Sequence, residues 1–315
     1  MGHRTSRWAA SAPVAAGWLG LAWACLFAGS LVAVGAAPAD RPARGADVRS
    51  VSALLQRDLN AEAPGGTVKV GYKRVGGETL PMEIDLPGGD GPFPFVIYLH
   101  GGGTPGKTPA QFRAQSLHMA QLGVAGVRIN YRGAERGPFE EILGNIMDAM
   151  AYVRANAPKH HLDLARMAWA GGSAGASLGA LAAQRTPECV AFVGFNGAYD
   201  IGRHLERFGG ADNLKESSFY GRLTPERIKE VSAIDQIRTP PPATLLLHGK
   251  ADKTVLPEQS QRFADAVKAR GGRAELRLYD GEQHGFFNDR RYDETVTDMQ
   301  VFLFDVFGLE GRRAR

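Results

Sequence analysis

The chain has 315 residues, of which 44% are hydrophobic and 22% charged, and its formal net charge is +4. A chain of this ordinary globular composition can bury a large core, and one domain with a leader fits it as well as two domains. The lysine and arginine residues are scattered along the chain and form no basic stripe, so we expect no nucleic-acid partner.

The N-terminal segment has the layout of a secretory leader. Basic residues precede a stretch from Trp8 to Ala39 that has no charged residue, and small residues at 34–37 offer a cleavage site. We therefore expect a signal peptide at 1–37 and a secreted or periplasmic protein with no stable membrane insertion. Because the apolar stretch is long enough to cross a bilayer, an uncleaved N-terminal anchor is the alternative.

A linker with one helix is expected between the leader and the folded domain, over residues 38–65. The residues at 38–50 are polar, and the pattern at 51–59 is typical of a helix. The folded domain is then expected to cover residues 66–310.

Apolar runs alternate with helical patterns through this domain. The runs at 68–75 and 80–87 flank Gly76 and Gly77 and are typical of an antiparallel hairpin. Six more strands are predicted at 93–100, 123–131, 166–172, 189–195, 243–249 and 274–280. Strands that alternate with helices predict an α/β fold, with a mostly parallel eight-stranded sheet and helices on both faces. The charged, Gly-rich segment at about 199–239 is the expected place of a small cap.

The sequence AGGSAGASLGAL contains the pattern G-x-S-x-G twice, centred on Ser173 and on Ser177. A nucleophilic serine of this type lies at a sharp turn between a strand and a helix, where its hydroxyl stands clear of the backbone. Ser173 follows a predicted strand directly, whereas Ser177 lies one helical turn further on. We predict that Ser173 is the nucleophile; a Gly-rich turn without chemistry is the alternative.

An activated serine needs a histidine base, and the base needs an acid that orients it. On an α/β sheet the expected order is serine, acid, histidine, each after a strand. His284 follows the last predicted strand and is favoured over His204 and His248. Asp252 follows the strand at 243–249 and is the favoured acid. The rival acids Asp200 and Asp280 also follow strands.

Backbone N–H groups must also stabilise the oxyanion that forms during acyl transfer. The motif HGGG at 100–103 follows a strand, and the N–H groups of Gly102 and Gly103, with that of Ala174, are the expected donors. His100 is expected to have a structural role.

The same loop also matches a phosphate-binding P-loop. The segment GGGTPGKT, Gly101 to Thr108, fits G-x-x-x-x-G-K-[ST], but Lys107 would need an aspartate that holds magnesium, for which Asp280 is a loose match. A nucleotide hydrolase would lose nucleotide binding when Lys107 is changed and would not need Ser173. No metal or cofactor is expected, and His160 and His161 are expected to be a solvated pair in a loop.

Four stretches resemble those of one known family in their order and spacing: PFVIYLHGGG, GGSAGASLGALAA, HGKADKTVLPEQSQRFADAV and HGFF. They are similar to secreted bacterial α/β-hydrolase esterases, in the carboxylesterase and acetyl or feruloyl esterase branch, related to hormone-sensitive-lipase-like enzymes. The resemblance spans about residues 66–307. The chain differs from many relatives at Ala176, where they have glycine.

The resemblance implies a serine esterase without a cofactor, in which Ser173, Asp252 and His284 form the triad. Its expected substrates are small-molecule esters, with acyl groups on carbohydrate among them. Prolyl-oligopeptidase-type peptidases share the C-terminal motifs and are the enzyme alternative. Those peptidases carry an upstream propeller domain that residues 38–65 are too few to form.

Overall fold

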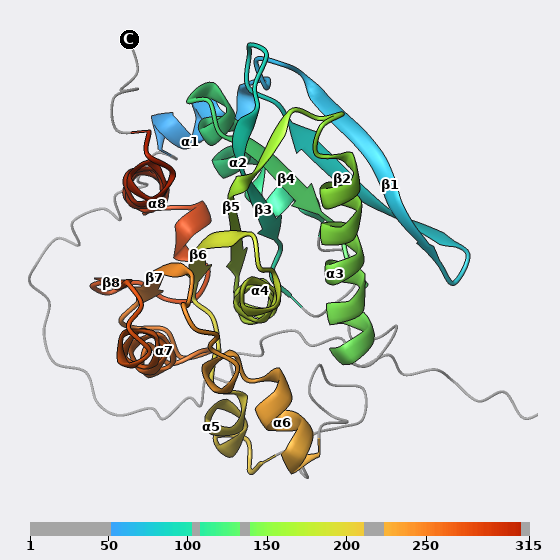
Figure 1. Cartoon of the computed structure of the whole chain (residues 1–315). Coiled ribbons are helices and arrows are strands. Elements are labelled where there is room, and N and C mark those ends of the chain that lie inside the picture. The colour runs from blue at the N-terminus through green and yellow to red at the C-terminus, as the bar shows by residue number, and fades with distance from the viewer. Residues whose placement is uncertain (1–51, 103–107, 133–138, 211–223, 310–315) are drawn as a thin grey trace, which may run out of the picture. The chain divides into compact units, whose positions relative to one another are not determined.

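The computed structural model describes residues 52–102, 108–132, 139–210 and 224–309. An eight-stranded sheet runs through this part of the chain in the order β1-β2-β4-β3-β5-β6-β7-β8 (Figure 1). β2 is antiparallel to β1 and β4, and all other neighbouring strands are parallel. The predicted eight-stranded, mostly parallel sheet is confirmed. The strands are β1 (Thr67–Val75), β2 (Glu78–Asp85), β3 (Phe93–Leu99), β4 (Ala125–Ile129), β5 (Leu162–Gly172), β6 (Cys189–Phe195), β7 (Ala243–Gly249) and β8 (Ala274–Tyr279).

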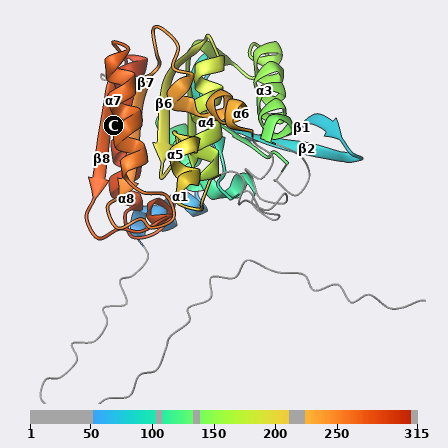
Figure 2. The same cartoon turned by 90° about the horizontal axis from the view of Figure 1, so that it is seen from below.

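Successive side chains of a strand point to opposite faces of the sheet. Because both sets are apolar in the central strands, helices cover both faces. In β3, Ile97 and Leu99 belong to one buried apolar cluster, whereas Val96 and Tyr98 belong to another. The first cluster is covered by α3 (Phe139–Asn156), α4 (Ala174–Arg185) and α7 (Glu258–Ala269). The second is covered by α1 (Ala53–Asn60), α2 (Arg113–Gln121) and α8 (Tyr292–Phe307). This strand order with two helical layers is the α/β-hydrolase fold (Figure 1 and Figure 2).

A buried ion pair joins the antiparallel edge of the sheet to its parallel part. Arg128 of β4 is 1% exposed, and its guanidinium donates to both carboxylate oxygens of Asp85 in β2, at 2.7 and 3.0 Å. Glu83 lies 2.7 Å from the same guanidinium. Burial alone would raise the pKa of Asp85, but the hydrogen bonds and charge of Arg128 outweigh it and lower the pKa. Both charges are therefore kept in the interior.

The segment predicted as a cap folds as short helices between β6 and β7. These are α5 (Ile201–Glu206), α6 (Pro225–Val231) and a 3-10 turn, η4 (Ala233–Asp235); residues 211–223 lie outside the described part. Thr224 caps α6 by accepting from the N–H of Arg227. The guanidinium of Arg227 also lies 2.7 Å from Glu140, at the start of α3. In Figure 2, α5 and α6 lie in front of α4, on the face of the sheet that α3, α4 and α7 cover.

Several elements differ from the prediction, among them β5 and α8. β5 begins at Leu162, four residues before the predicted start at residue 166, because its first residues include Asp163 and Arg166 and lack the apolar run used to find strands. α8 is not among the predicted elements, although its buried residues Val296 and Met299 are three apart, as on one face of a helix. Among the described residues, no helix combines the length and apolar character that crossing a membrane requires.

Candidate active site

Ser173 occupies the sharp turn between β5 and α4. Its φ of 54° and ψ of −123° lie in a region that side-chain-bearing residues rarely adopt, at a cost of about 1–3 kcal/mol. The N–H of Ser173 donates to the carbonyl of Phe195 at the end of β6, at 2.8 Å. Ser177 lies inside α4, where its N–H donates to the carbonyl of Ser173. Of the two serines in the overlapping pattern, Ser173 stands at the strand-to-helix turn.

The glycines of the pattern are required by close backbone packing at this turn. A Cβ on Gly171 would lie 2.2 Å from the carbonyl oxygen of Gly175. A Cβ on Gly175 would lie 2.3 Å from the carbonyl oxygen of Leu99 and 2.4 Å from that of His100. Real Cβ atoms do not approach oxygen so closely, so the first turn of α4 can rest on the end of β3 only when these positions have no side chain.

We expect Gly175→Ala to destabilise the protein by about 2–4 kcal/mol, because the added methyl group meets backbone that cannot move aside. Urea unfolding followed by circular dichroism measures this change. Gly144→Ala in α3 is the matched control: its Cβ meets nothing within 4 Å, and it should stabilise by about 0.5–1 kcal/mol. Equal stability of the two variants would contradict this explanation of the pattern.

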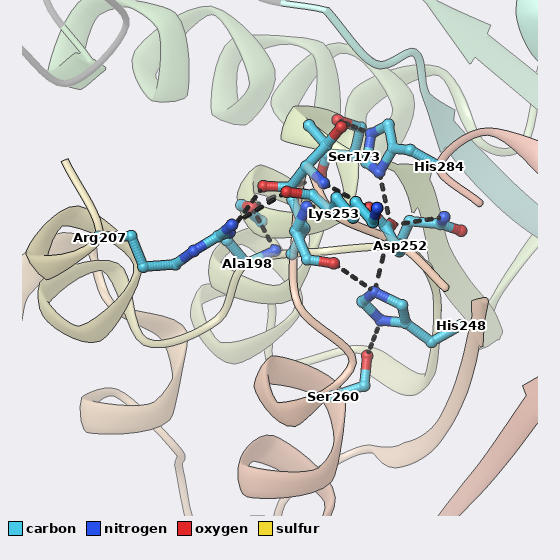
Figure 3. Close-up of polar contacts among 12 residues, drawn as sticks. Ser173, Ala198, Arg207, His248, Asp252, Lys253, Ser260 and His284 are labelled. Atoms are coloured by element: carbon cyan, nitrogen blue, oxygen red, sulfur yellow. Dashed lines mark hydrogen bonds and ion pairs between the residues drawn. The ribbon is translucent and has the colours of Figure 1, made fainter. Parts of the chain in front are cut away.

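The structure brings Ser173, His284 and Asp252 into one hydrogen-bonded line (Figure 3). His284 Nε2 lies 2.9 Å from Ser173 Oγ, and His284 Nδ1 lies 2.7 Å from Asp252 Oδ2. Asp252 follows β7 and His284 follows β8, so all three residues stand at the C-terminal ends of parallel strands. The carboxylate only accepts, so Nδ1 carries the proton and Nε2 is free to accept the hydroxyl proton of Ser173.

Asp252 is held by donors on both carboxylate oxygens. Oδ1 accepts from the N–H groups of Thr254 and Val255, at 2.8 and 3.0 Å, and Oδ2 accepts from the amide of Asn196, at 3.1 Å. The carboxylate is 2% exposed, and burial alone would raise its pKa. Hydrogen bonds from His248 and His284 outweigh that effect, and the pKa of Asp252 lies well below its usual range. A charged Asp252 is therefore the stable form at neutral pH.

Two residues around Asp252 are absent from the sequence prediction of the site. Asn196 follows β6 with φ at 53°, and the dipeptide Asn-Gly at 196–197 is a known signal for such a turn. His248 is fully buried in β7 and lies on the side of Asp252 away from Ser173 (Figure 3). The sequence contains no local signal for its contact with the acid.

The rival acids Asp200 and Asp280 and the rival base His204 lie elsewhere, whereas the rival base His248 contacts Asp252 and not Ser173. Asp200 caps α5 by accepting from the N–H of Arg203 and forms an ion pair with Arg262, at 2.7 Å. Asp280 is exposed and pairs with Lys250, at 2.7 Å. His204 is buried in α5, where burial and then the charges of Arg207 and His284 lower its pKa to about 4. None of these side chains contacts Ser173 in the described residues.

The loop after β3 approaches the serine turn. Gly102 has φ at 79°, and a Cβ on Gly101 would lie 2.7 Å from the carbonyl oxygen of Gly172. His100 is buried, hydrogen-bonds to Asn130 at 3.0 Å and stacks on the ring of Tyr131, so its predicted structural role is confirmed. Gly103 and Lys107 lie outside the described residues, as does most of the P-loop alternative. Ala174, the third expected N–H donor, begins α4.

The expectation for the paired histidines is wrong for one of them. His161 is exposed, but His160 is 4% exposed, because it closes the turn between α3 and β5 with its ring near Tyr152. Burial and the charges of Lys159 and His161 lower the pKa of His160. Within the described ranges no three His, Cys, Asp or Glu side chains are grouped as metal ligands would be.

The sequence matches the model of the family BD-FAE over residues 82–267. Among curated proteins it is 25% identical over 256 residues to a probable carboxylic ester hydrolase, LipM, of Mycobacterium tuberculosis, over 72% of this chain and 57% of the relative. It is 24% identical over 233 residues to a probable isoprenylcysteine alpha-carbonyl methylesterase, ICMEL2, of Arabidopsis thaliana, over 64% of this chain and 54% of the relative. The chain spans about half the length of the curated relatives it matches.

Solved structures resemble this fold more completely. The apo form of Thermogutta terrifontis esterase 2 superposes with a TM-score of 0.67 and 28% identity, over 78% of this chain and 97% of that chain. The same esterase phosphonylated by sarin has equal values. A further structure of it, with butyrate bound, has a TM-score of 0.64 and 27% identity, over 78% and 96% of the two chains.

Proposed function

The chain belongs to the BD-FAE family, and on that basis we propose that it hydrolyses carboxylic esters by nucleophilic attack from Ser173. The observation that carries the proposal is the pair of hydrogen bonds that links Ser173 through His284 to Asp252. The names of the relatives support it, since they include a carboxylic ester hydrolase and a methylesterase. The organophosphate-modified esterase with the same fold supports a serine-type reaction.

In the proposed first step, Ser173 Oγ bonds to the carbonyl carbon of the ester while His284 Nε2 takes the hydroxyl proton. The electron pair of the C=O double bond moves to the oxygen. Asp252 holds the ring in place and stabilises its charged form. His284 then gives the proton to the alcohol oxygen, the ester C–O bond breaks, and the acyl group stays on Ser173. Water then attacks the acyl carbon while His284 takes its proton. The bond between Ser173 Oγ and that carbon breaks, His284 returns the proton to Oγ, and the acid leaves.

The negative oxygen of each tetrahedral intermediate needs donors at a fixed place. We propose the backbone N–H of Ala174, at the N-terminus of α4, and those of Gly102 and Gly103. The N-terminal end of a helix carries partial positive charge, which favours an anion there. Loss of one such donor raises the activation free energy by about 3 kcal/mol. Backbone donors need no side-chain movement during the reaction.

We propose short acyl groups as the acid part of the substrate, and carbohydrate-borne acyl groups among the substrates. The first is supported by the esterase of the same fold, whose structures carry propionate and butyrate. The second is supported by the resemblance to acetyl and feruloyl esterases.

A substrate panel tests the proposal. We expect the purified protein to hydrolyse 4-nitrophenyl acetate and butyrate, and to release acetate or ferulate from substituted xylan. A peptide 4-nitroanilide should react at least about a thousandfold more slowly, which separates an esterase from a peptidase. A fluorophosphonate should label Ser173, as located by mass spectrometry. Absence of ester turnover at every chain length, or faster cleavage of the peptide, would contradict the proposal.

We propose that residues 1–37 are a leader and that the mature enzyme is secreted or periplasmic. The support is the arrangement of basic, apolar and small residues in the sequence. N-terminal sequencing of the protein exported by a bacterial host should begin near residue 38. Recovery of the intact chain from the membrane fraction would favour the uncleaved anchor.

A further inference from the structure

His248 connects the acid of the site to the core of the domain. It is the penultimate residue of β7 and is fully buried. Its Nδ1 lies 2.7 Å from Ser260 Oγ in the first turn of α7, and its Nε2 lies 2.9 Å from the carbonyl oxygen of Val255. The same Nε2 lies 3.3 Å from Asp252 Oδ2. One ring therefore contacts a strand-end loop, a helix and the carboxylate.

These partners decide where the proton of His248 lies. A carbonyl oxygen can only accept, so the proton is on Nε2 and is directed between Val255 and Asp252. Nδ1 then accepts from the hydroxyl of Ser260, which is also fully buried. The neutral ring thus presents a fixed N–H to the oxygen that His284 uses.

Asp252 Oδ2 is the meeting point of these contacts. It accepts from His284 at 2.7 Å and from Asn196 at 3.1 Å, and His248 Nε2 lies 3.3 Å from it. The donors come from three different segments, so together they fix the direction in which the carboxylate faces His284 (Figure 3). Among the contacts that lower the pKa of Asp252 against its burial, that of His248 is the largest.

We propose that His248 is a positioning residue for the reaction of Ser173: its Nε2–H holds Asp252 Oδ2 in line with His284 and partly balances the carboxylate charge. The inference rests on the proposed ester hydrolysis. His248 has no contact with Ser173 and acts only through Asp252. Small displacements of catalytic groups cost about a hundredfold in rate, so its effect should appear in kcat.

The test compares His248→Gln with His248→Met, two side chains of similar length. Glutamine can place its amide near the former Nε2 and donate to Asp252, whereas methionine has no donor. We expect His248→Met to lower kcat roughly 10- to 100-fold with KM within about twofold. His248→Gln should stay within about threefold of the wild-type kcat. Active-site titration with a fluorophosphonate corrects each rate for the fraction of folded protein.

The pH profile gives a readout that packing alone would not change. Without the donor of His248, the carboxylate of Asp252 is more negative toward His284 and stabilises the charged ring more strongly. The acid limb of kcat/KM should then move to higher pH in His248→Met and stay in place in His248→Gln. The other charged or titratable groups near the pair are the same in both variants: His204 of α5, Arg207, which follows α5, and Lys253, which follows Asp252.

His118 offers a matched control. It is also buried and also contacts a buried carboxylate, Asp58, at 3.0 Å, but through α1 and α2. Glutamine and methionine at position 118 should change stability and leave the pH profile in place. If His248→Met does not fold, His248→Leu, which also lacks a donor, replaces it and should shift the acid limb in the same direction.

Equal kcat and equal pH profiles for His248→Gln and His248→Met would overturn the inference and leave His248 as a packing residue. The same holds for a His248→Leu profile identical to the wild type, where that variant is used. Failure of the proposed function has a different signature: the wild-type protein would turn over no ester, or Ser173→Ala would remain active.

Discussion

Ser173→Ala should lower kcat/KM for 4-nitrophenyl acetate roughly 10⁵- to 10⁶-fold, the largest effect expected of any single substitution in this protein. The reason is that no other group can form the acyl intermediate at the serine turn, where His284 Nε2 is 2.9 Å from Ser173 Oγ. Initial rates with each variant at high enzyme concentration measure the loss. Fluorophosphonate labelling should disappear in parallel.

Ser177→Ala is the control that the overlapping pattern provides. Ser177 Oγ accepts from the N–H of Ala198 at 3.2 Å and lies inside α4, so its loss should cost about 1–2 kcal/mol of stability. Its kcat/KM should remain within about tenfold of the wild type. If Ser177→Ala removes activity and Ser173→Ala does not, the assignment of the nucleophile is wrong.

The backbone at Ser173 adds a second expectation. With φ at 54° and ψ at −123°, the residue has a conformation that glycine adopts readily and other residues do not. Ser173→Gly should therefore be as inactive as Ser173→Ala and more stable than the wild type by about 1 kcal/mol. Urea unfolding measures the difference; a glycine variant no more stable than the alanine variant would show that the turn is not strained.

Asp252→Asn should lower kcat about 10⁴-fold, because an amide can no longer hold the protonated Nδ1 of His284 and stabilise its charged form. In either rotamer of the amide, its N–H₂ would face donors that Asp252 now satisfies: those of His284 and Asn196 on one side, or the N–H groups of Thr254 and Val255 on the other. We expect a loss of about 2–4 kcal/mol of stability at neutral pH from these unpaired donors. Ester hydrolysis and urea unfolding at pH 7 measure the two losses.

Acid pH should reduce the difference in stability between Asp252→Asn and the wild type. The pKa of Asp252 is lower in the folded protein than its ordinary value of 3.8. Its contribution to stability is therefore complete above that value and is lost as the pH falls toward the folded pKa. Asparagine does not titrate, so the difference in free energy of unfolding should be greatest near neutral pH and smaller below about pH 4.

The rival acids supply the controls for Asp252→Asn. Asp280→Asn should be nearly neutral, since its contact with Lys250 is on the surface. Asp200→Asn should lower stability slightly through the cap of α5 and keep kcat within about tenfold of the wild type. A kcat loss in either control as large as that of Asp252→Asn would place the acid elsewhere.

Much of this protein can be predicted from its sequence because the relevant signals are local. Each strand of a parallel sheet is an apolar run that must be buried on both faces, so its position is visible without its partners. The serine turn is visible because close backbone packing demands glycine at Gly171 and Gly175, and these lie next to Ser173 in the chain. The expected order of serine, acid and histidine then singled out Asp252 and His284, and the structure brings them together.

The tertiary structure alone decided how distant segments meet. The strand order places β4 between β2 and β3, and this pairing gives the buried Arg128 its partner Asp85, 43 residues away. Likewise, Asn196 reaches Asp252, 56 residues away, only because β6 and β7 are neighbours in the sheet. The physical reason is the same in each case: the free energy of these contacts depends on burial and on distances between side chains far apart in sequence. A local pattern specifies which residues need partners, and the packed sheet determines which partners they obtain.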